Sequence, residues 1–271
     1  MSHQTDLKRV ISIAKETGVL LREGFKSDFG ITYKNSEIDL VTDYDRRAEA
    51  LIFQRINENY PEHAIVGEES GEIGNSASAY RWYVDPIDGT TNFAHGIPSY
   101  SISIALYVNK TPLIGVVYDP SRDECFAAAR GMGTQLITAD QTPQPLRCSS
   151  TETIRQSVIA TGFPYDRHSS NWDNLEQLGR MAKRCQGIRR SGSAALDLAY
   201  VAAGRFDAYW EYKLNMWDLA AGVLLVLEAG GRVSNLVDGS PFKPEHLNHI
   251  VASNHNSHQA LCDLLVGPVA A

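Results

Sequence analysis

The chain has 271 residues, 43% of them hydrophobic and 21% charged, which is enough to bury the core of one large domain or of two closely joined halves. Its formal net charge of -7 argues against direct binding to nucleic acid or to anionic membranes, because a polyanion would meet net repulsion. Charges interrupt the apolar residues near the N-terminus, and no apolar run approaches the roughly 18 residues of a membrane span. The four cysteines form no C-x-x-C pair, so we expect a protein of the reducing cytoplasm without a zinc site or a disulfide framework.

The first part of the chain is predicted to form two amphipathic helices. Apolar residues recur at helical spacing from Leu7 to Phe25. A strand-like segment, Ile31 to Lys34, leads by a polar connection to a second helix that begins at Thr42 and runs to about Glu58. Thr42 suits the N-cap, and Asp45 in the first turn complements the helix dipole.

Short apolar runs separated by turn residues predict a mostly meandering sheet next. These predicted strands are Ala64 to Val66, Tyr83 to Val84, Ile102 to Val108, Leu113 to Val117 and Cys125 to Ala129. The segment from Gly71 to Ala79 is typical of a surface loop because its residues are small and polar. A second polar stretch, Ala139 to Ser150, closes this part of the chain.

Helical and strand-like patterns alternate in the rest of the chain, which is typical of an α/β arrangement. The predicted helices are Asn171 to Lys183, Ser193 to Gly204 and Trp217 to Ala229, and the predicted strands are Val158 to Ala160, Ile188 to Arg190, Ala208 to Trp210 and His249 to Ala252. We therefore predict a single domain over residues 1–271, with an N-terminal α+β half (1–143) and a C-terminal α/β half (144–271).

Acidic residues stand where two predicted strands end. Glu68 and Glu69 directly follow one strand. Asp85 ends the next, and Asp88 comes three residues later in a turn that a proline stiffens, so the two carboxylates can converge on one point. This pair could also serve only to shape the turn, because aspartate and proline are favoured in turns.

Helix starts supply the other candidate residues. Gly89, Thr90 and Thr91 open a short helix, and the first N–H groups of a helix suit a phosphate. Asp45 and Asp218 also stand near helix starts, where a single aspartate is most often a cap. Together, these carboxylates without a nearby histidine or thiol favour Mg²⁺ over zinc or copper. A two-metal centre could activate water and stabilise a departing oxygen.

Three motifs in this order resemble those of the inositol monophosphatase family: G-E-E-S from Gly67, W-Y-V-D-P-I-D-G-T-T-N-F from Trp82 and W-D-x-A-x-G from Trp217. The resemblance extends from Asp39 to Gly231, nearly the whole chain. It implies the layered αβαβα sandwich of the inositol monophosphatase and fructose-1,6-bisphosphatase type, and a homodimer.

The resemblance also implies the metal ligands. Glu68, Asp85 and the backbone carbonyl of Ile87 would hold one Mg²⁺, and Asp85, Asp88 and Asp218 would hold a second. A third, weaker ion would lie near Glu68. The site would thus hold two or three Mg²⁺ ions, and the family is typically inhibited by lithium.

Catalytic roles follow from the same resemblance. Thr90 and Asp45 would activate water, with Glu68 as a third catalytic residue, and no covalent phosphoenzyme is required. The phosphate would be bound by Gly89, Thr90 and Thr91.

The substrate's alcohol part and a mobile loop complete the implied site. The alcohol would meet Asp88, Gly192, Ser193, Ala194 and Glu211. For Glu211 the alternative is an exposed glutamate at a strand end. The loop would span Gly30 to Asp39, with Lys34 near the phosphate and the outer metal.

We therefore expect a Mg²⁺-dependent phosphomonoesterase that hydrolyses inositol monophosphate or a similar polyol or sugar phosphate. Relatives in the family that act on histidinol phosphate, fructose 1,6-bisphosphate or 3′-phosphoadenosine 5′-phosphate share the same motifs, so these substrates remain alternatives. A binding protein associated with the transcription machinery, as some bacterial relatives are, is an alternative of a different class. A third alternative is a glycosidase that uses the Asp85 and Asp88 pair, but the sequence shows no obvious separate residue to act as the general acid.

Overall fold

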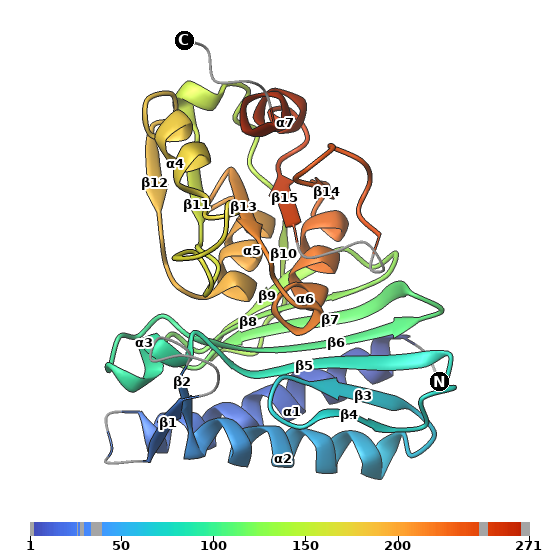
Figure 1. Ribbon diagram of the computed structural model, residues 1–271. Helices are drawn as coiled ribbons and strands as arrows, with labels where there is room; N and C mark the ends of the chain where they lie inside the picture. Colours follow the sequence, from blue (N-terminus) through green and yellow to red (C-terminus); the bar gives the residue numbers. More distant parts are fainter. Residues whose placement is uncertain (1–2, 26, 28–29, 34–39, 244–248, 267–271) are drawn as a thin grey trace.

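Two helices and an eight-stranded sheet form the lower part of the molecule in Figure 1. The computed structural model describes residues 3–25, 27, 30–33, 40–243 and 249–266. Helices α1 (His3–Gly24) and α2 (Asp43–Asn59) cover one face of this sheet and pack against β7 and β5. The predicted cap of α2 is confirmed, because the Tyr44 N–H donates to Thr42 Oγ1 (3.2 Å) and the Thr42 N–H donates to Asp45 Oδ2 (2.7 Å).

The eight-stranded sheet has the order β10-β9-β8-β7-β6-β5-β3-β4. Its strands are β3 (Ala64–Gly67), β4 (Gly71–Gly74), β5 (Tyr80–Asp88), β6 (Ser101–Val108), β7 (Thr111–Asp119), β8 (Glu124–Ala129), β9 (Thr134–Ile137) and β10 (Gln144–Leu146). Strands β3 and β5 pair in parallel, so their carboxyl ends lie at the same edge. A separate antiparallel pair, β1 (Ile31–Tyr33) and β2 (Leu40–Thr42), precedes α2.

Helices α5 (Ala194–Ala202) and α6 (Met216–Glu228) lie between the eight-stranded sheet and a second sheet (Figure 1). Both are apolar almost all round, as expected for helices buried between two sheets. The second sheet has the order β12-β11-β13-β15-β14. Its strands are β11 (Val158–Thr161), β12 (Gly187–Arg189), β13 (Ala208–Tyr212), β14 (Arg232–Asn235) and β15 (His249–Ser253).

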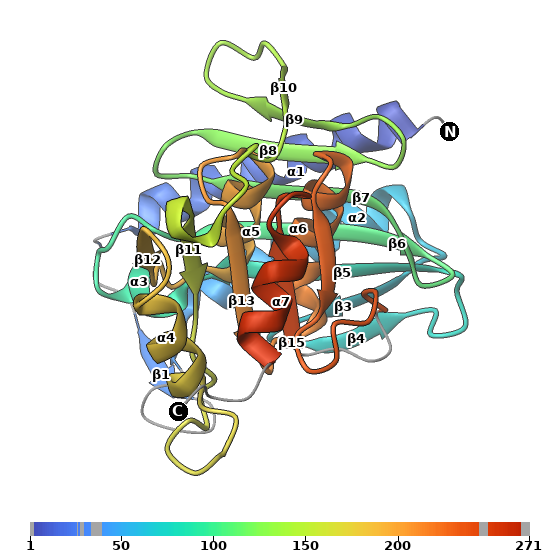
Figure 2. The ribbon, with the colours of Figure 1, turned by 90° about the horizontal axis from the view of Figure 1, so that it is seen from above.

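Helices α4 (Leu175–Ala182) and α7 (His258–Val266) lie over the outer face of the second sheet, as Figure 2 shows from above. Two short helical segments complete the chain, α3 (Thr90–Ala94) after β5 and the 3-10 turn η1 (Ile154–Gln156) before β11. The predicted layered αβαβα fold is confirmed. No helix in the described part of the chain is long and apolar enough to cross a membrane.

The structure places strands in two segments that were not predicted as strands, one of them predicted as a surface loop. The segment expected to be a surface loop from residue 71 begins with β4, and the polar stretch after residue 139 contains β10. Both are edge strands with mostly exposed residues, so neither shows the alternation of apolar and polar residues that identifies a half-buried strand. The predicted division at residue 144 stays a prediction, and β10 begins there as part of the first sheet.

Candidate active site

Strand ends and helix starts from both sheets line one pocket of about 510 Å³. The predicted site residues that line this pocket are Glu68, Asp85, Ile87, Asp88, Gly89, Thr90, Thr91, Gly192, Ser193, Ala194, Glu211 and Asp218. Asp45 lies behind Thr90, fully buried. Lys34 lies outside the described residues. The structure therefore brings together residues that are as much as 150 positions apart in the chain.

The turn after β5 carries the central carboxylates. The pairing of β5 with β6 shifts register between Asp85 and Asp88, and such irregularities re-aim side chains at the end of a strand. Asp85 Oδ1 accepts the N–H of Ile87 (3.0 Å). Gly89 follows with φ +98°, and a Cβ there would lie 3.0 Å from the Gly192 carbonyl oxygen. Only glycine meets both conditions, so this residue lets the two sides of the pocket approach each other.

Asp88 binds the start of α5. The Ser193 hydroxyl donates to Asp88 Oδ2 (2.6 Å), and the backbone N–H groups of Ala194 and Ala195 donate to Oδ1 (3.2 Å) and Oδ2 (2.7 Å). A carboxylate at a helix N-terminus also interacts favourably with the helix dipole. Two residues predicted to contact the alcohol, Ser193 and Ala194, thus hold Asp88 in this structure.

Thr90 connects the turn to α2. Its Oγ1 lies 3.0 Å from Asp45 Oδ1 and 3.0 Å from the Ile87 carbonyl oxygen. The hydroxyl has one proton, and a carboxylate is the stronger acceptor. Burial raises the pKa of Asp45 to about 7, against the hydrogen bonds from Thr42 that lower it. Thr90 and Asp45, predicted to act as a pair, are within hydrogen-bond distance.

The carboxylates of the pocket raise one another's pKa. Burial raises the pKa of Asp85 well above its usual range, and the charges of Glu68, Asp88 and Asp218 raise it further. Burial likewise raises the pKa of Asp88 to about 6, and burial followed by the charge of Glu68 raises that of Asp218. A bound cation would relieve this repulsion.

The donor set suits a hard cation, since every pocket residue just named offers oxygen. No three acidic, histidine or cysteine side chains among the described residues already stand close enough together to hold a metal ion. Binding an ion would therefore require these carboxylates to close in around it.

Two buried acidic residues escaped the sequence analysis. Glu49 accepts the N–H of Glu69 (2.9 Å) and the hydroxyl of Ser70, so it fixes the segment that follows β3. Asp197 lines the pocket from α5. Each stands four residues after a predicted site residue, Asp45 or Ser193, on the same helix face. That spacing is the signal that could have identified them.

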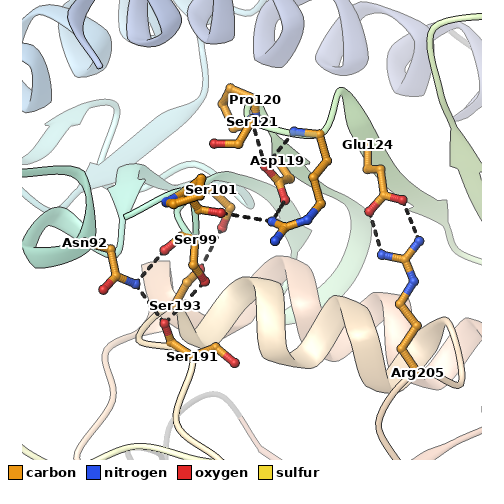
Figure 3. A network of polar contacts seen from close by, with 12 residues as sticks. Asn92, Ser99, Ser101, Asp119, Pro120, Ser121, Glu124, Ser191, Ser193 and Arg205 are labelled. Atoms are coloured by element: carbon orange, nitrogen blue, oxygen red, sulfur yellow. Dashed lines mark hydrogen bonds and ion pairs between the residues drawn. The ribbon is translucent and has the colours of Figure 1, made fainter. Parts of the chain in front are cut away.

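A hydrogen-bonded seam joins the two sides of the pocket (Figure 3). Asn92 donates from Nδ2 to the backbone carbonyls of Ser99 (2.6 Å) and Ser191 (2.8 Å). The hydroxyls of Ser101 and Ser193 are 3.1 Å apart. In the same view, Arg205 and Glu124 form a two-contact ion pair (2.5 and 2.6 Å). The seam fixes the turn before α5 relative to α3.

Known proteins resemble this chain over nearly its whole length. An inositol-1-monophosphatase of Synechocystis is 42% identical over 96% of this chain and 90% of the relative. A Nus factor SuhB of Pseudomonas aeruginosa is 45% identical over 82% of this chain and 81% of the relative. The solved inositol monophosphatase of Anabaena superposes with a TM-score of 0.87 and 38% identity, covering 98% of each chain. The model of the inositol monophosphatase family matches residues 3–267, and the chain belongs to that family.

Proposed function

We propose that the chain is a Mg²⁺-dependent phosphomonoesterase that hydrolyses inositol monophosphate or a similar polyol or sugar phosphate. The observation that carries this proposal is the convergence in one pocket of the carboxylates that follow β3, end β5 and begin α6. Membership of the family supports a phosphatase, and the family is generally metal-dependent. The name of the Synechocystis relative, inositol-1-monophosphatase, supports the choice of substrate.

The carboxylates would hold two or three Mg²⁺ ions. We assign the first ion to Glu68, Asp85 and the Ile87 carbonyl, and the second to Asp85, Asp88 and Asp218. When bound, Mg²⁺ supplies a Lewis acid that polarises phosphate oxygens and makes water more acidic. Asp88 Oδ1 still has a lone pair for such a role, since it accepts the Ala194 N–H, whereas the Ser193, Ala195 and long Ser101 (3.5 Å) contacts are made to Oδ2.

Thr90 and Asp45 would orient the attacking water. If the Thr90 hydroxyl donates its hydrogen bond to Asp45, the Ile87 carbonyl is left as a free ligand and the Thr90 oxygen can accept a hydrogen bond from water. As Thr90 took a proton from that water, its own hydroxyl proton would pass to Asp45, whose pKa burial raises to about 7, so that Asp45 can take it up near neutral pH. Glu68, whose charge adds to this shift, is the third catalytic residue of the proposal.

The phosphate and the alcohol would lie at opposite ends of the pocket. The first N–H groups of α3, at Gly89, Thr90 and Thr91, would bind phosphate oxygens, because the start of a helix leaves them without intrahelical acceptors. Glu211 would accept hydroxyl hydrogens of the alcohol beside Gly192. It is buried in the pocket wall and accepts the phenol hydroxyl of Tyr209, which excludes the alternative of an exposed glutamate.

The proposal also includes a cytoplasmic location, a homodimer and inhibition by lithium. The proposed contact of Lys34 with phosphate stays a prediction because that residue lies outside the described part of the chain.

The test is phosphate release from a panel of esters: inositol 1-phosphate, histidinol phosphate, fructose 1,6-bisphosphate and 3′-phosphoadenosine 5′-phosphate. Each is measured with Mg²⁺, with chelator, and with Mg²⁺ plus Li⁺. We expect turnover of inositol 1-phosphate that requires Mg²⁺ and falls with Li⁺. Turnover of histidinol phosphate far above inositol 1-phosphate would overturn the proposed substrate, and release that persists with chelator would overturn the proposed mechanism.

A binding role is the second candidate, favoured by the 45% identity to a relative named Nus factor SuhB. The variant Asp88→Asn, which removes a charge from the pocket, distinguishes the catalytic role from the binding role. If the chain acts only by binding, phosphate release with Mg²⁺ is absent and this substitution changes nothing. If it is an enzyme, release is present and the substitution abolishes it.

A further inference from the structure

A second acidic side chain faces the alcohol end of the pocket. Asp197 stands on α5, one turn after Ser193, and lines the same pocket as Glu211. Its residue is only 1% exposed. The proposed mechanism uses neither of its carboxylate oxygens.

One oxygen of Asp197 is unsatisfied. Within the described residues, Oδ1 is buried and has no hydrogen-bond partner. Native proteins leave few buried polar atoms in this state, because the lost contact with water is not compensated. This oxygen has almost no exposed surface although the residue lines the pocket, so a donor on a bound molecule can pair with it once the side chain turns towards the pocket.

Asp197 shares the pocket with two other carboxylates, Asp88 and Glu211, and with Arg190. Burial raises the pKa of Asp197 well above the usual range; a hydrogen bond from Ser191 lowers it, the charges of Asp88 and Glu211 raise it, and that of Arg190 lowers it. Hydroxyls on carbons next to the ester are the donors that a polyol phosphate would present to Asp197 and Glu211.

The wall behind Glu211 fixes the second acceptor. A Cβ at Gly162 would lie 2.1 Å from Glu211 Oε2, so the carboxylate packs directly against backbone. The Tyr209 hydroxyl donates to the same oxygen. Arg190 lines the pocket and its Nη1 would lie 2.7 Å from a Cβ at Gly192, which brings a positive charge to this end. The alcohol end thus offers two carboxylates and one guanidinium.

We propose that Asp197 is a specificity-determining residue, a second acceptor beside Glu211 for the hydroxyl groups of the substrate alcohol. The pocket then selects esters whose alcohol carries at least two free hydroxyls near the phosphate. An alcohol without hydroxyls leaves both acceptors unpaired, and polar sites discriminate strongly against such analogues. This inference rests on the proposed phosphatase function.

The experiment measures kcat and KM of the full-length chain with Mg²⁺ for two esters, inositol 1-phosphate and p-nitrophenyl phosphate, whose alcohol part has no free hydroxyl. The variants are Asp197→Ala and Asp197→Asn, which keeps an acceptor oxygen. We expect Asp197→Ala to lower kcat/KM for inositol 1-phosphate by about tenfold, mainly through KM, as for the loss of one buried hydrogen bond. For p-nitrophenyl phosphate the change stays within about twofold, and Asp197→Asn loses less than Asp197→Ala.

A merely structural role of Asp197 would lower the turnover of both esters together. That result would overturn this inference and leave the proposed phosphatase function standing. Unchanged kinetics for both esters would overturn it too. Melting curves of both variants show whether they fold. If Asp197→Ala does not fold, Asp197→Asn, which keeps the shape of the side chain, is used for the comparison of the two esters. A wild-type chain that releases phosphate from neither ester would overturn the proposed function, and this inference with it.

Discussion

The end of the pocket that we assign to the phosphate and the end that we assign to the alcohol are built differently. Backbone groups make most of the contacts to the carboxylates of the phosphate end: Asp85 accepts the N–H of Ile87, and Asp88 accepts two N–H groups at the start of α5 besides the Ser193 hydroxyl. At the alcohol end, side chains hold side chains, as the Tyr209 hydroxyl holds Glu211. Groups held by backbone keep their position whatever the neighbouring side chains are.

The largest effect should come from the phosphate end. Asp85→Asn removes a charge that we assign to two ions at once. We expect kcat to fall by about 10²- to 10³-fold or more for every ester that the wild-type chain hydrolyses, because a preorganised charged group is lost. The measurement is phosphate release at saturating Mg²⁺ for a polyol ester and for p-nitrophenyl phosphate.

A matched control is Asp119→Asn, which neutralises another fully buried aspartate at a strand end of the same sheet. Asp119 pairs with Arg122 and does not line the pocket. It should leave kcat unchanged in the folded protein. An equal loss in both variants, or a loss with Asp85→Asn that is confined to one ester, would remove the distinction between the two ends.

A smaller and selective effect should come from the alcohol end. Glu211→Ala removes the acceptor that we assign to substrate hydroxyls. We expect KM for inositol 1-phosphate to rise about tenfold, which corresponds to the loss of one hydrogen bond to a charged group. Turnover of p-nitrophenyl phosphate should change little. A similar loss for both esters would show that Glu211 supports the reaction itself and not the choice of alcohol.

Local sequence signals mark the residues that we assign to the phosphate end more clearly than those that we assign to the alcohol end, for a physical reason. Local signals mark a strand end, a helix cap or a turn, and Asp45, Asp85 and Gly89 stand at such places. The partners of Asp88 at the start of α5 are more than 100 positions away, and nothing local to Ser193 shows that its hydroxyl is used by that carboxylate. The burial of Asp197 between two layers is likewise a product of the assembled fold.

The same limit explains why two edge strands of the first sheet were not predicted. Long buried strands such as β6 and β7 carry a continuous apolar run and were predicted. The edge strands β4 and β10 are short and largely exposed, and each pairs with a single neighbouring strand. A side-chain pattern therefore gives no signal for them.

The smallest effect concerns stability. Burial raises the pKa of Asp88 to about 6, so without metal this carboxyl keeps a proton that the unfolded chain has released above about pH 4. The folded state then binds more protons than the unfolded state, and this group's contribution to stability is lost as the pH rises from about 4 through 6. Mg²⁺ binds the ionised carboxylate, so the rise in Tm on adding Mg²⁺ should be greater at about pH 7.5 than at pH 5. Each kcal/mol by which Mg²⁺ raises the free energy of unfolding more at pH 7.5 corresponds to about 2–4 °C in Tm.

Comparing melting curves with Mg²⁺ and with chelator at each pH cancels groups remote from the site, such as His258, whose pKa burial lowers to about 4. Asp88→Asn should reduce the pH dependence of the Mg²⁺ effect, because it removes one titrating metal ligand and leaves Asp85 and Asp218, whose pKa values burial also raises. Glu211→Gln should leave most of it, although burial also raises the pKa of Glu211, to about 7, because we assign no ion to that carboxylate. If both variants reduced the pH dependence of the Mg²⁺ effect equally, Glu211 would take part in metal binding as Asp88 does. The distinction between the two ends of the pocket would then be wrong.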